Sequence, residues 1–207
     1  MLDDVRNFNE PDAVKIPLIL ASGSPRRKQL LEQIGLEFEV CPSQVHENFC
    51  LNLSPEAFTE YWAKEKAMDV AKSNPQSLVV AADTIVVLDH KILGKPKNKK
   101  DSYRMLKSLS GRTHKVITGM HFSAGKYNID RTINEQTQVL FKTLSDSDIY
   151  YYIDNYRPFD KAGSYGIQDW FSVQVKKVDG CYFNVMGLPL AAFYKEYRQI
   201  NNQLEIL

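Results

Sequence analysis

The sequence has few cysteines, almost no net charge and no long apolar run, and each shortage excludes a class of protein. Its three cysteines, Cys41, Cys50 and Cys181, are an odd number without metal-ligand spacing, so we expect reduced thiols rather than disulfides or zinc. A formal net charge of +1 gives no global field for nucleic acid or an anionic membrane. No segment approaches the roughly 20 apolar residues that span a bilayer. We therefore expect a cytoplasmic protein with no nucleic-acid or membrane partner.

The start of the chain, residues 1–15, is polar, lacks periodicity and is acidic rather than signal-like. We interpret it as an N-terminal arm. Residues 16–207 are then long enough to form one domain with a sizeable core. The hydrophobic fraction of 43% and the charged fraction of 25% are those of an ordinary soluble globular protein. Periodicity by itself supports a mixed α and β domain.

Residues 18–34 predict a strand, a tight turn and a helix. Ser24 followed by Pro25 is a strong N-cap and first-position pair, so we expect the helix to begin at Pro25. Acidic side chains are favoured at this end of a helix, yet the first turn carries Arg26, Arg27 and Lys28. A bound phosphate, held also by the hydroxyls of Ser22 and Ser24, would explain these cations. Exposure of the three side chains to solvent explains them about as well.

A second stretch, residues 78–88, is an apolar β-branched run broken only by Asp83 and Thr84. The run predicts strands buried on both faces, with a kink or turn at the polar pair. A carboxylate in that setting must be paired, hydrogen-bonded or bound to a metal, because an isolated buried charge costs several kcal/mol. Asp83 is therefore the acid best placed for chemistry. The structural alternative is a buried salt bridge to a lysine such as Lys66 or Lys95.

The second half of the chain predicts hairpins and one glycine-containing loop. Residues 114–141 alternate in the manner of two long strands. Asp179-Gly180 is a strong two-residue turn signal, so residues 173–178 and 181–185 are expected to pair as strands. The two glycines within residues 160–168 permit a close approach of the backbone to a ligand.

Seven short motifs follow one another between residues 18 and 194. They are ASGSPRRKQLLEQIG (21–35), EKA (65–67), AADTIVV (81–87), LGKP (93–96), LSGRTHKVITG (109–119), DKAGSYGIQ (160–168) and NVMGLPL (184–190). Each is weak alone. Together, and in this order, they resemble the Maf family of nucleoside triphosphate pyrophosphatases, once described as septum formation inhibitors.

The resemblance implies both a fold and an activity. The fold is α/β and Maf/ITPase-like, with a mixed, elongated β-sheet flanked by helices and a central cleft between two lobes. The activity is hydrolysis of nucleoside triphosphates, dTTP and UTP in this branch, to nucleoside monophosphate and pyrophosphate, as nucleotide-pool housekeeping. The partner is the triphosphate substrate, and a homodimer is left open. The alternative is a nucleotide-sensing or cell-division regulatory binding protein without significant turnover.

The resemblance also assigns roles to individual residues. Those matched to catalysis are Asp83, Glu47, Lys66 and Lys95. Those matched to substrate binding are Ser22, Ser24, Arg26, Arg27, Thr84, Lys161 and Gln168. Glu47 and Asp83 are matched to a divalent metal cation, and hard oxygen ligands suit Mg or Mn. Attack of water on an α-phosphorus needs cations, a metal and a carboxylate, which this set can supply. A P-loop enzyme is disfavoured because the sequence has no GxxxxGK[ST] motif.

We expect Gln168 to recognise the base, and the segment after it departs from the family pattern. The amide of Gln168 can donate to O4 or O2 of uracil or thymine and accept from N3–H. Many family members continue after this glutamine with a small, glycine-containing segment, whereas residues 169–172 here are Asp-Trp-Phe-Ser. Trp170 could stack on the base or fill the core, and we expect it in the core.

Overall fold

One mixed sheet runs through the computed structural model, which describes residues 16–48 and 51–204. Within these residues its strands are β1 (Leu18–Leu20), β2 (Glu39–Val40), β3 (Leu78–Leu88), β4 (Lys91–Leu93), β5 (Thr113–Ala124), β6 (Ile129–Phe141) and β7 (Val175–Asp179). Their spatial order is β2-β1-β3-β5-β6-β7, with β4 paired to β3. β1 is parallel to β2 and β3, and the other described pairs are antiparallel. The expected α/β class with a mixed sheet is confirmed. The arm expected at residues 1–15 lies outside the described residues.

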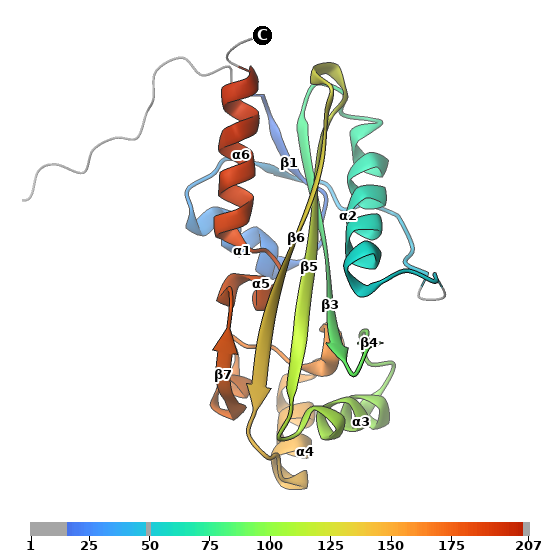
Figure 1. Cartoon of the computed structure of the whole chain (residues 1–207), viewed down its shortest axis with the longest axis vertical. Helices are drawn as coiled ribbons and strands as arrows, with labels where there is room; N and C mark the ends of the chain where they lie inside the picture. The colour runs from blue at the N-terminus through green and yellow to red at the C-terminus, as the bar shows by residue number, and fades with distance from the viewer. Residues whose placement is uncertain (1–15, 49–50, 205–207) are drawn as a thin grey trace, which may run out of the picture.

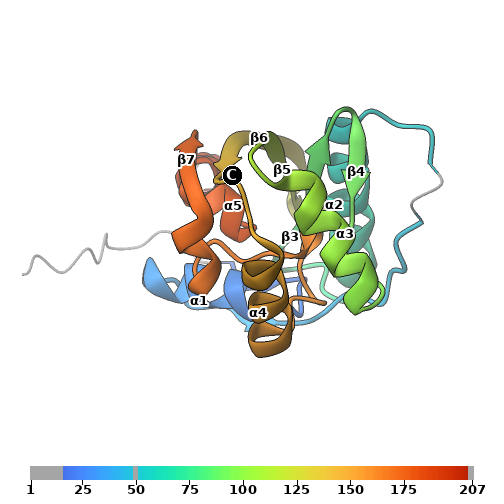
Figure 2. The same ribbon diagram turned by 90° about the horizontal axis from the view of Figure 1, so that it is seen from below.

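Helices cover the long strands at both ends of the molecule. They are α1 (Pro25–Gln33), α2 (Pro55–Ala71), α3 (Lys99–Leu109), α4 (Asp146–Tyr156), α5 (Tyr182–Met186) and α6 (Leu190–Leu204). α2 and α6 lie on opposite sides of the long strands in the upper half of Figure 1. α3 and α4 lie at the lower end, which faces the viewer in Figure 2. No described helix is long and apolar enough to cross a membrane.

Serine caps begin two of these helices. The Ser54 side chain accepts a hydrogen bond from the Ala57 amide at 3.2 Å, at the start of α2. Ser145 accepts one from the Asp148 amide at 3.1 Å, at the start of α4. α1 begins at Pro25 as predicted, although the Ser24 side chain makes no capping bond there. The fixed φ of the proline therefore helps to set this helix start without the serine bond.

Two apolar clusters divide the molecule into an upper and a lower lobe, and β3 contributes to both. The upper cluster joins β1, β3 and β5 to α1 and α6, and the lower one joins β3, β5 and β6 to α3 and α4. Asp83 and Thr84 lie between them, in register with Gly119 and Thr118 of β5. β3 is a single unbroken strand, so the expected kink at the polar pair is wrong. Their side chains find partners while their backbone stays in the ladder.

The predicted hairpin at residues 173–185 is wrong in its second half. β7 ends at Asp179, but the segment after Gly180 forms the short helix α5. The Asn184 side chain donates to the Val116 carbonyl at 3.1 Å and to the Thr137 hydroxyl at 2.9 Å. These buried bonds dock the segment onto β5 and β6 through a side chain. The tertiary contact therefore overrides the local turn signal.

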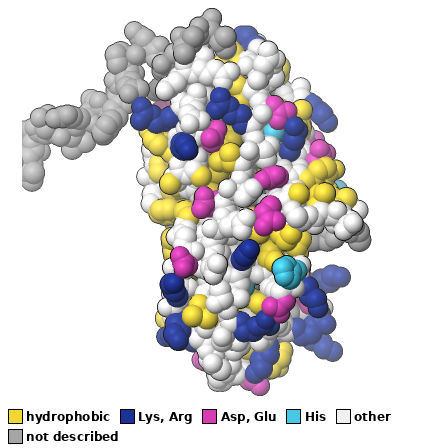
Figure 3. All heavy atoms as spheres, viewed as in Figure 1, with side chains coloured by type: hydrophobic (Ala, Val, Ile, Leu, Met, Phe, Trp, Pro, Cys, Tyr) yellow, Lys and Arg dark blue, Asp and Glu magenta, His cyan; other side chains and the backbone are white. Residues whose placement is uncertain are grey.

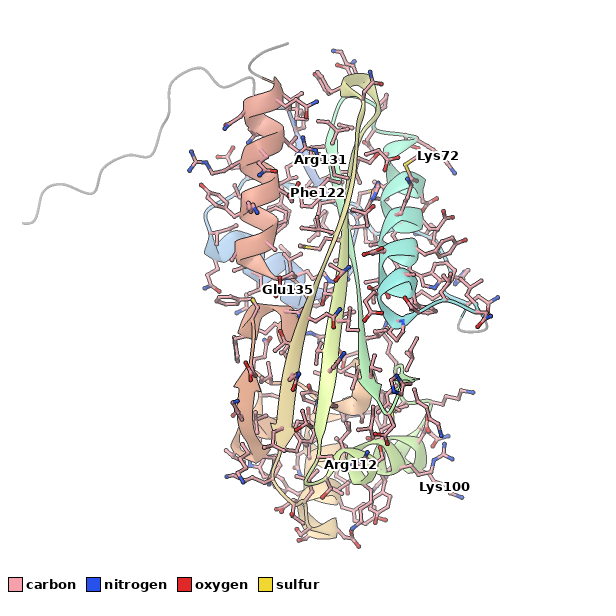
Figure 4. The ribbon with its side chains drawn as sticks, in the orientation of Figure 1. Lys72, Lys100, Arg112, Phe122, Arg131 and Glu135 are labelled. Carbon is pink, nitrogen blue, oxygen red and sulfur yellow. The ribbon has the colours of Figure 1, made fainter. Side chains whose placement is uncertain are left out.

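α6 is joined to the sheet by polar as well as apolar contacts (Figure 4). Arg131 on β6 donates to the side-chain oxygen of Gln203 at 2.6 Å and pairs with Glu196 at 3.4 Å. Phe122 on β5 packs against Phe193, with ring centroids 5.7 Å apart. Both contacts fix α6 on the side of the sheet away from α2.

Gly119 allows α2 to lie against β5, and this close approach generates the first prediction. A Cβ at Gly119 would lie 2.5 Å from the carbonyl carbon of Thr59. Gly119→Ala must push α2 away and should lower the free energy of unfolding by about 1–3 kcal/mol, as overpacking does. Denaturant titration measures this change.

Gly125→Ala is the matched control. Its added Cβ would meet no heavy atom within 4 Å, so its free energy of unfolding should stay within about 0.5 kcal/mol of the parent. Equal unfolding midpoints for the parent and Gly119→Ala would contradict the close packing of α2.

Candidate functional site

A cavity of about 390 Å³ opens beside the middle of β3, where the two lobes meet. Its wall contains all of the residues that the resemblance assigns: Ser22, Ser24, Arg26, Arg27, Glu47, Lys66, Asp83, Thr84, Lys95, Lys161 and Gln168. They come from the β1–α1 turn, the first turn of α1, the loop after β2, α2, β3, the segment after β4 and the loop after α4. The expected central cleft is present, and it gathers these side chains in one place.

Lys66 lies between two carboxylates in this cavity. Its ammonium donates to Glu47 Oε1 and to Asp83 Oδ1, each at 2.6 Å. Asp83 is 4% exposed, and its second oxygen, Oδ2, has no hydrogen-bond partner among the described residues. A buried carboxylate oxygen without a partner is costly, so the site retains capacity for one more donor or cation.

The two carboxylates differ in their pKa. Burial raises the pKa of Asp83 and outweighs the opposing attraction of the Lys66 ammonium. Burial also pushes the pKa of Glu47 upward, but Lys66, with a smaller contribution from Lys95, more than offsets it and leaves the value below its ordinary range. Neighbouring carboxylates whose environments push their pKa values apart are suited to different roles.

The loop that carries Glu47 is held against α2 by another aspartate. Asp69 Oδ2 accepts hydrogen bonds from the Ser43 hydroxyl at 2.8 Å and from the Gln44 amide at 2.9 Å. These bonds lower the pKa of Asp69 and fold the loop back over the helix. Glu47 is thereby brought to Lys66, 19 positions away in the sequence.

Arg27 braces three segments of the chain from inside the cavity wall. Its Nε donates to the Gly187 carbonyl at 2.8 Å, Nη1 to the Ser22 hydroxyl at 3.1 Å and Nη2 to the Thr84 hydroxyl at 3.0 Å. Burial lowers the pKa of Arg27, partly offset by the charge of Asp83. A guanidinium has five N–H groups, so two remain for a ligand. Oxygen acceptors of the protein therefore bind the Arg27 guanidinium, and they account for much of the positive charge that the sequence leaves unexplained at the start of α1.

The other cations near α1 have acidic partners. Arg26 pairs with Asp160 at 2.8 Å, and Asp160 also pairs with Lys161 at 2.7 Å. Burial raises the pKa of Asp160, but the two cations outweigh it and the value is lowered overall. Lys28 lies 3.5 Å from Glu32 on the same helix. Asp160 links α1 to the loop at residues 160–168 across the cavity rim. This role was not predicted from the sequence, although Asp160 is the first residue of the DKAGSYGIQ motif.

Thr84 and Gln168 differ in how far their hydrogen-bonding groups are available to a ligand. The Thr84 hydroxyl accepts from Arg27 and shares a hydrogen bond with the Thr118 hydroxyl at 2.9 Å. Gln168 is exposed at the cavity wall. Trp170 packs on the aromatic side chains of α4, with its ring centroid 4.9 Å from that of Tyr151, and it does not line the cavity. The bulky segment after Gln168 therefore fills the lower lobe rather than the cavity.

A model of one protein family, described as Maf-like protein, matches residues 17–200 of this sequence. The chain belongs to the Maf family. A relative from Bacillus pumilus is 48% identical over 174 residues, covering 84% of this chain and 91% of that protein, and is named dTTP/UTP pyrophosphatase. One from Cytophaga hutchinsonii, with the same name, is 44% identical over 191 residues, covering 91% of this chain and 87% of that protein. The resemblance stated from the motifs is confirmed.

Solved structures of HAM1 proteins are similar to this Maf chain over part of its length. The protein from Coxiella burnetii matches with a TM-score of 0.43 and 14% identity, over 61% of this chain and 73% of that one. The one from Staphylococcus aureus gives 0.44 and 14%, over 60% and 71%.

The Maf cavity offers a small set of oxygen ligands. Within residues 16–48 and 51–204, no group of three or more His, Cys, Asp or Glu side chains could hold a metal ion. Glu47 and Asp83 are two carboxylates that could both bind a metal ion. Asp83 Oδ2, which is buried and has no hydrogen-bond partner among the described residues, is an oxygen available as a ligand. Two carboxylates fit Mg or Mn, because such ions complete their coordination with water and substrate phosphates.

Other titratable groups of the Maf chain lie outside this cavity. His114 is buried, its pKa is lowered to about 4 by burial, and its Nε2 is 2.8 Å from the Tyr165 hydroxyl. Lys and Arg are most numerous at the lower end of the face shown in Figure 3, where Figure 4 labels Lys100 and Arg112. Several cations there have acidic partners: Lys99 with Asp154, Lys107 with Asp146 and Arg112 with Asp89. Acidic side chains therefore balance part of the positive charge at the lower end.

The brace made by Arg27 leads to the second prediction. Arg27→Ala removes the guanidinium donor to the Gly187 carbonyl and to the Ser22 and Thr84 hydroxyls, so the free energy of unfolding should fall by about 1–3 kcal/mol in the absence of nucleotide. Arg26→Ala is the control, since it removes only a rim ion pair, a type of contact that contributes about 0–1 kcal/mol. Denaturant unfolding of both variants measures the difference, and equal losses would contradict the brace.

Proposed function

We propose that this chain hydrolyses nucleoside triphosphates, dTTP and UTP foremost, to nucleoside monophosphate and pyrophosphate. The observation that carries the proposal is the buried Asp83 carboxylate, paired with Lys66 and still free at Oδ2, at a cavity wall that also holds Arg26, Lys95 and Lys161. A polyanionic substrate fits such a wall, and a buried acid with a raised pKa suits a general base. The names of the relatives support the same activity.

In this mechanism Asp83 accepts a proton from water as the water oxygen attacks the α-phosphorus. The bond from the α-phosphorus to the bridging oxygen breaks, and pyrophosphate leaves with that oxygen. Lys66, Lys95 and Lys161 neutralise the charge that builds on the phosphate oxygens in the transition state. Glu47 and Asp83 would hold the divalent cation, which supplies further positive charge to those oxygens when bound.

Gln168 carries the choice of base in this proposal. Its exposed amide can pair with uracil or thymine, while the Thr84 hydroxyl is already engaged by Arg27 and Thr118. Arg26 and Arg27 bind the phosphates with their remaining N–H groups. The hydroxyls of Ser22 and Ser24, with the adjacent backbone at the start of α1, bind them as well. Homodimer formation and a cytoplasmic location stay predictions.

The third prediction concerns Asp83. Asp83→Asn is nearly isosteric but cannot take a proton, so turnover should fall at least about a hundredfold. The free energy of unfolding should not fall at neutral pH. Because burial raises the pKa of Asp83, the folded parent holds its proton to higher pH than the unfolded chain. The parent therefore loses stability as pH rises from the ordinary value of 3.8 through the raised pKa, and the Asn variant does not.

Unfolding of both proteins from about pH 4 to about pH 8 measures this difference, alongside steady-state rates. The control is Asp154→Asn, which removes one partner of the exposed ion pair with Lys99 and does not alter the cavity wall. An Asp83→Asn protein that turns over substrate at the parental rate would remove this residue from the mechanism.

The fourth prediction tests the activity and the base together. Pyrophosphate release should require a divalent cation, and UTP and dTTP should have specificity constants at least about tenfold above those of GTP, ATP and 7-methyl-GTP. A site that pairs with a pyrimidine leaves polar groups unsatisfied with a purine, at about 1–3 kcal/mol for each group. The measurement is initial-rate pyrophosphate release from each nucleotide, with and without magnesium.

The possible outcomes of this assay are separable. A purine preference would contradict the pyrimidine assignment and leave the pyrophosphatase assignment intact. Tight nucleotide binding without pyrophosphate release would instead favour the nucleotide-sensing alternative.

A further inference from the structure

The hydroxyl of Tyr152 on α4 connects a backbone amide before Gln168 to the side chain of the residue after it. It accepts a hydrogen bond from the Gly166 amide at 2.9 Å and donates one to Asp169 Oδ2, also at 2.9 Å. Gly166 precedes Gln168 by two residues, and Asp169 follows it directly. One buried side chain therefore holds both ends of a short segment whose centre faces the cavity.

Asp169 completes this connection on its other oxygen. Asp169 Oδ1 accepts a hydrogen bond from the Phe171 amide at 3.0 Å, where it caps a 3₁₀ helix (Trp170–Gln174). A Cβ at Gly166 would lie 2.5 Å from Asp169 Oδ2 and 3.0 Å from Lys161 Cε. Only a glycine allows the amide, the carboxylate and the hydroxyl to meet at this distance.

The Tyr152 ring is itself fixed by its neighbours. It is stacked on Tyr156 and Trp170, with centroids 5.3 Å and 6.1 Å away, and it contacts Phe171 at 4.8 Å. The whole side chain is buried, and burial, reinforced by the charge of Asp169, raises the pKa of its hydroxyl far above the ordinary value. The hydroxyl thus stays protonated and in one place, as a positioning group requires.

We infer that Tyr152 and Asp169 are positioning residues that hold Gln168 in the orientation that selects a pyrimidine base. This inference rests on the proposed function and adds the residues that set its specificity. Neither residue lines the cavity. Tyr152 acts through the Gly166 amide, and Asp169 acts through the Tyr152 hydroxyl. The aromatic segment after Gln168 therefore contributes to base selection from behind the cavity wall.

Tyr152→Phe tests the inference because it removes only the hydroxyl. The preference for UTP over GTP, as a ratio of specificity constants, should fall about tenfold, with the larger part of the loss in KM for UTP. Asp169→Ala should give a similar loss. The double variant should lose less than the product of the two single losses, because the hydrogen bond between Tyr152 and Asp169 is shared by both. Calorimetric binding of UMP and GMP provides a second readout that does not depend on turnover.

Tyr165→Phe is the matched control. It also removes a buried tyrosine hydroxyl of the lower lobe and keeps the ring, which lines the cavity. The Tyr165 hydroxyl bonds to His114 on β5 and to neither Gly166 nor Asp169. It should cost comparable thermal stability while keeping the parental UTP to GTP ratio. A merely structural role for Tyr152 predicts the same result for both variants.

The outcomes distinguish this inference from the proposed function. If the parent prefers UTP and Tyr152→Phe keeps that preference, the positioning role is overturned and the proposed function stands. If Tyr152→Phe and Tyr165→Phe relax the preference equally, the positioning role is again overturned. If the parent shows no pyrimidine preference in rates or in UMP binding, the positioning role and the pyrimidine assignment fail together, and the pyrophosphatase assignment stands.

Discussion

A buried carboxylate in the middle of a strand demands a cation, and this demand shapes the centre of the molecule. Asp83 lies in β3 with apolar clusters above and below it, where an unpaired charge would be strongly unfavourable. Lys66 supplies the positive charge from α2 and is shared with Glu47. Replacing such a group with a hydrophobic one often stabilises a protein, so the persistence of the charge cluster is better explained by chemistry than by stability.

The position of α2 follows from the same requirement. For the Lys66 ammonium to reach the strand, the helix must lie close to the sheet, and Gly119 makes room for it beside Thr59. Asp69 on the same helix then ties the loop that delivers Glu47. A glycine, a helix and a loop are thus arranged around one lysine and its two carboxylates, which explains why the cavity wall is built from segments far apart in the sequence.

Local sequence patterns predict the structural features that depend on residues close together in the chain. The helix starts at Pro25 and Pro55 follow from serine and proline chemistry, and Asp83 stands out because it interrupts an apolar run. Glu47 has no such signal, since a loop acid is ordinarily solvated, and the family motif alone identifies it. The brace of Arg27 and the helix around Asn184 could not be predicted from local pattern, because each depends on hydrogen bonds to residues distant in the sequence.

The unbroken long strands have a mechanical consequence for the cavity. β3, β5 and β6 pass from one lobe to the other as a continuous hydrogen-bonded ladder, and no bulge interrupts their pairing beside Asp83. Moving the lobes apart would require bending or breaking many of these bonds at once, so the strands act as a stiff beam rather than a hinge. Changes in the width of the entrance are therefore confined to the rim, where the exposed pair of Arg26 and Asp160 is a single weak contact to open.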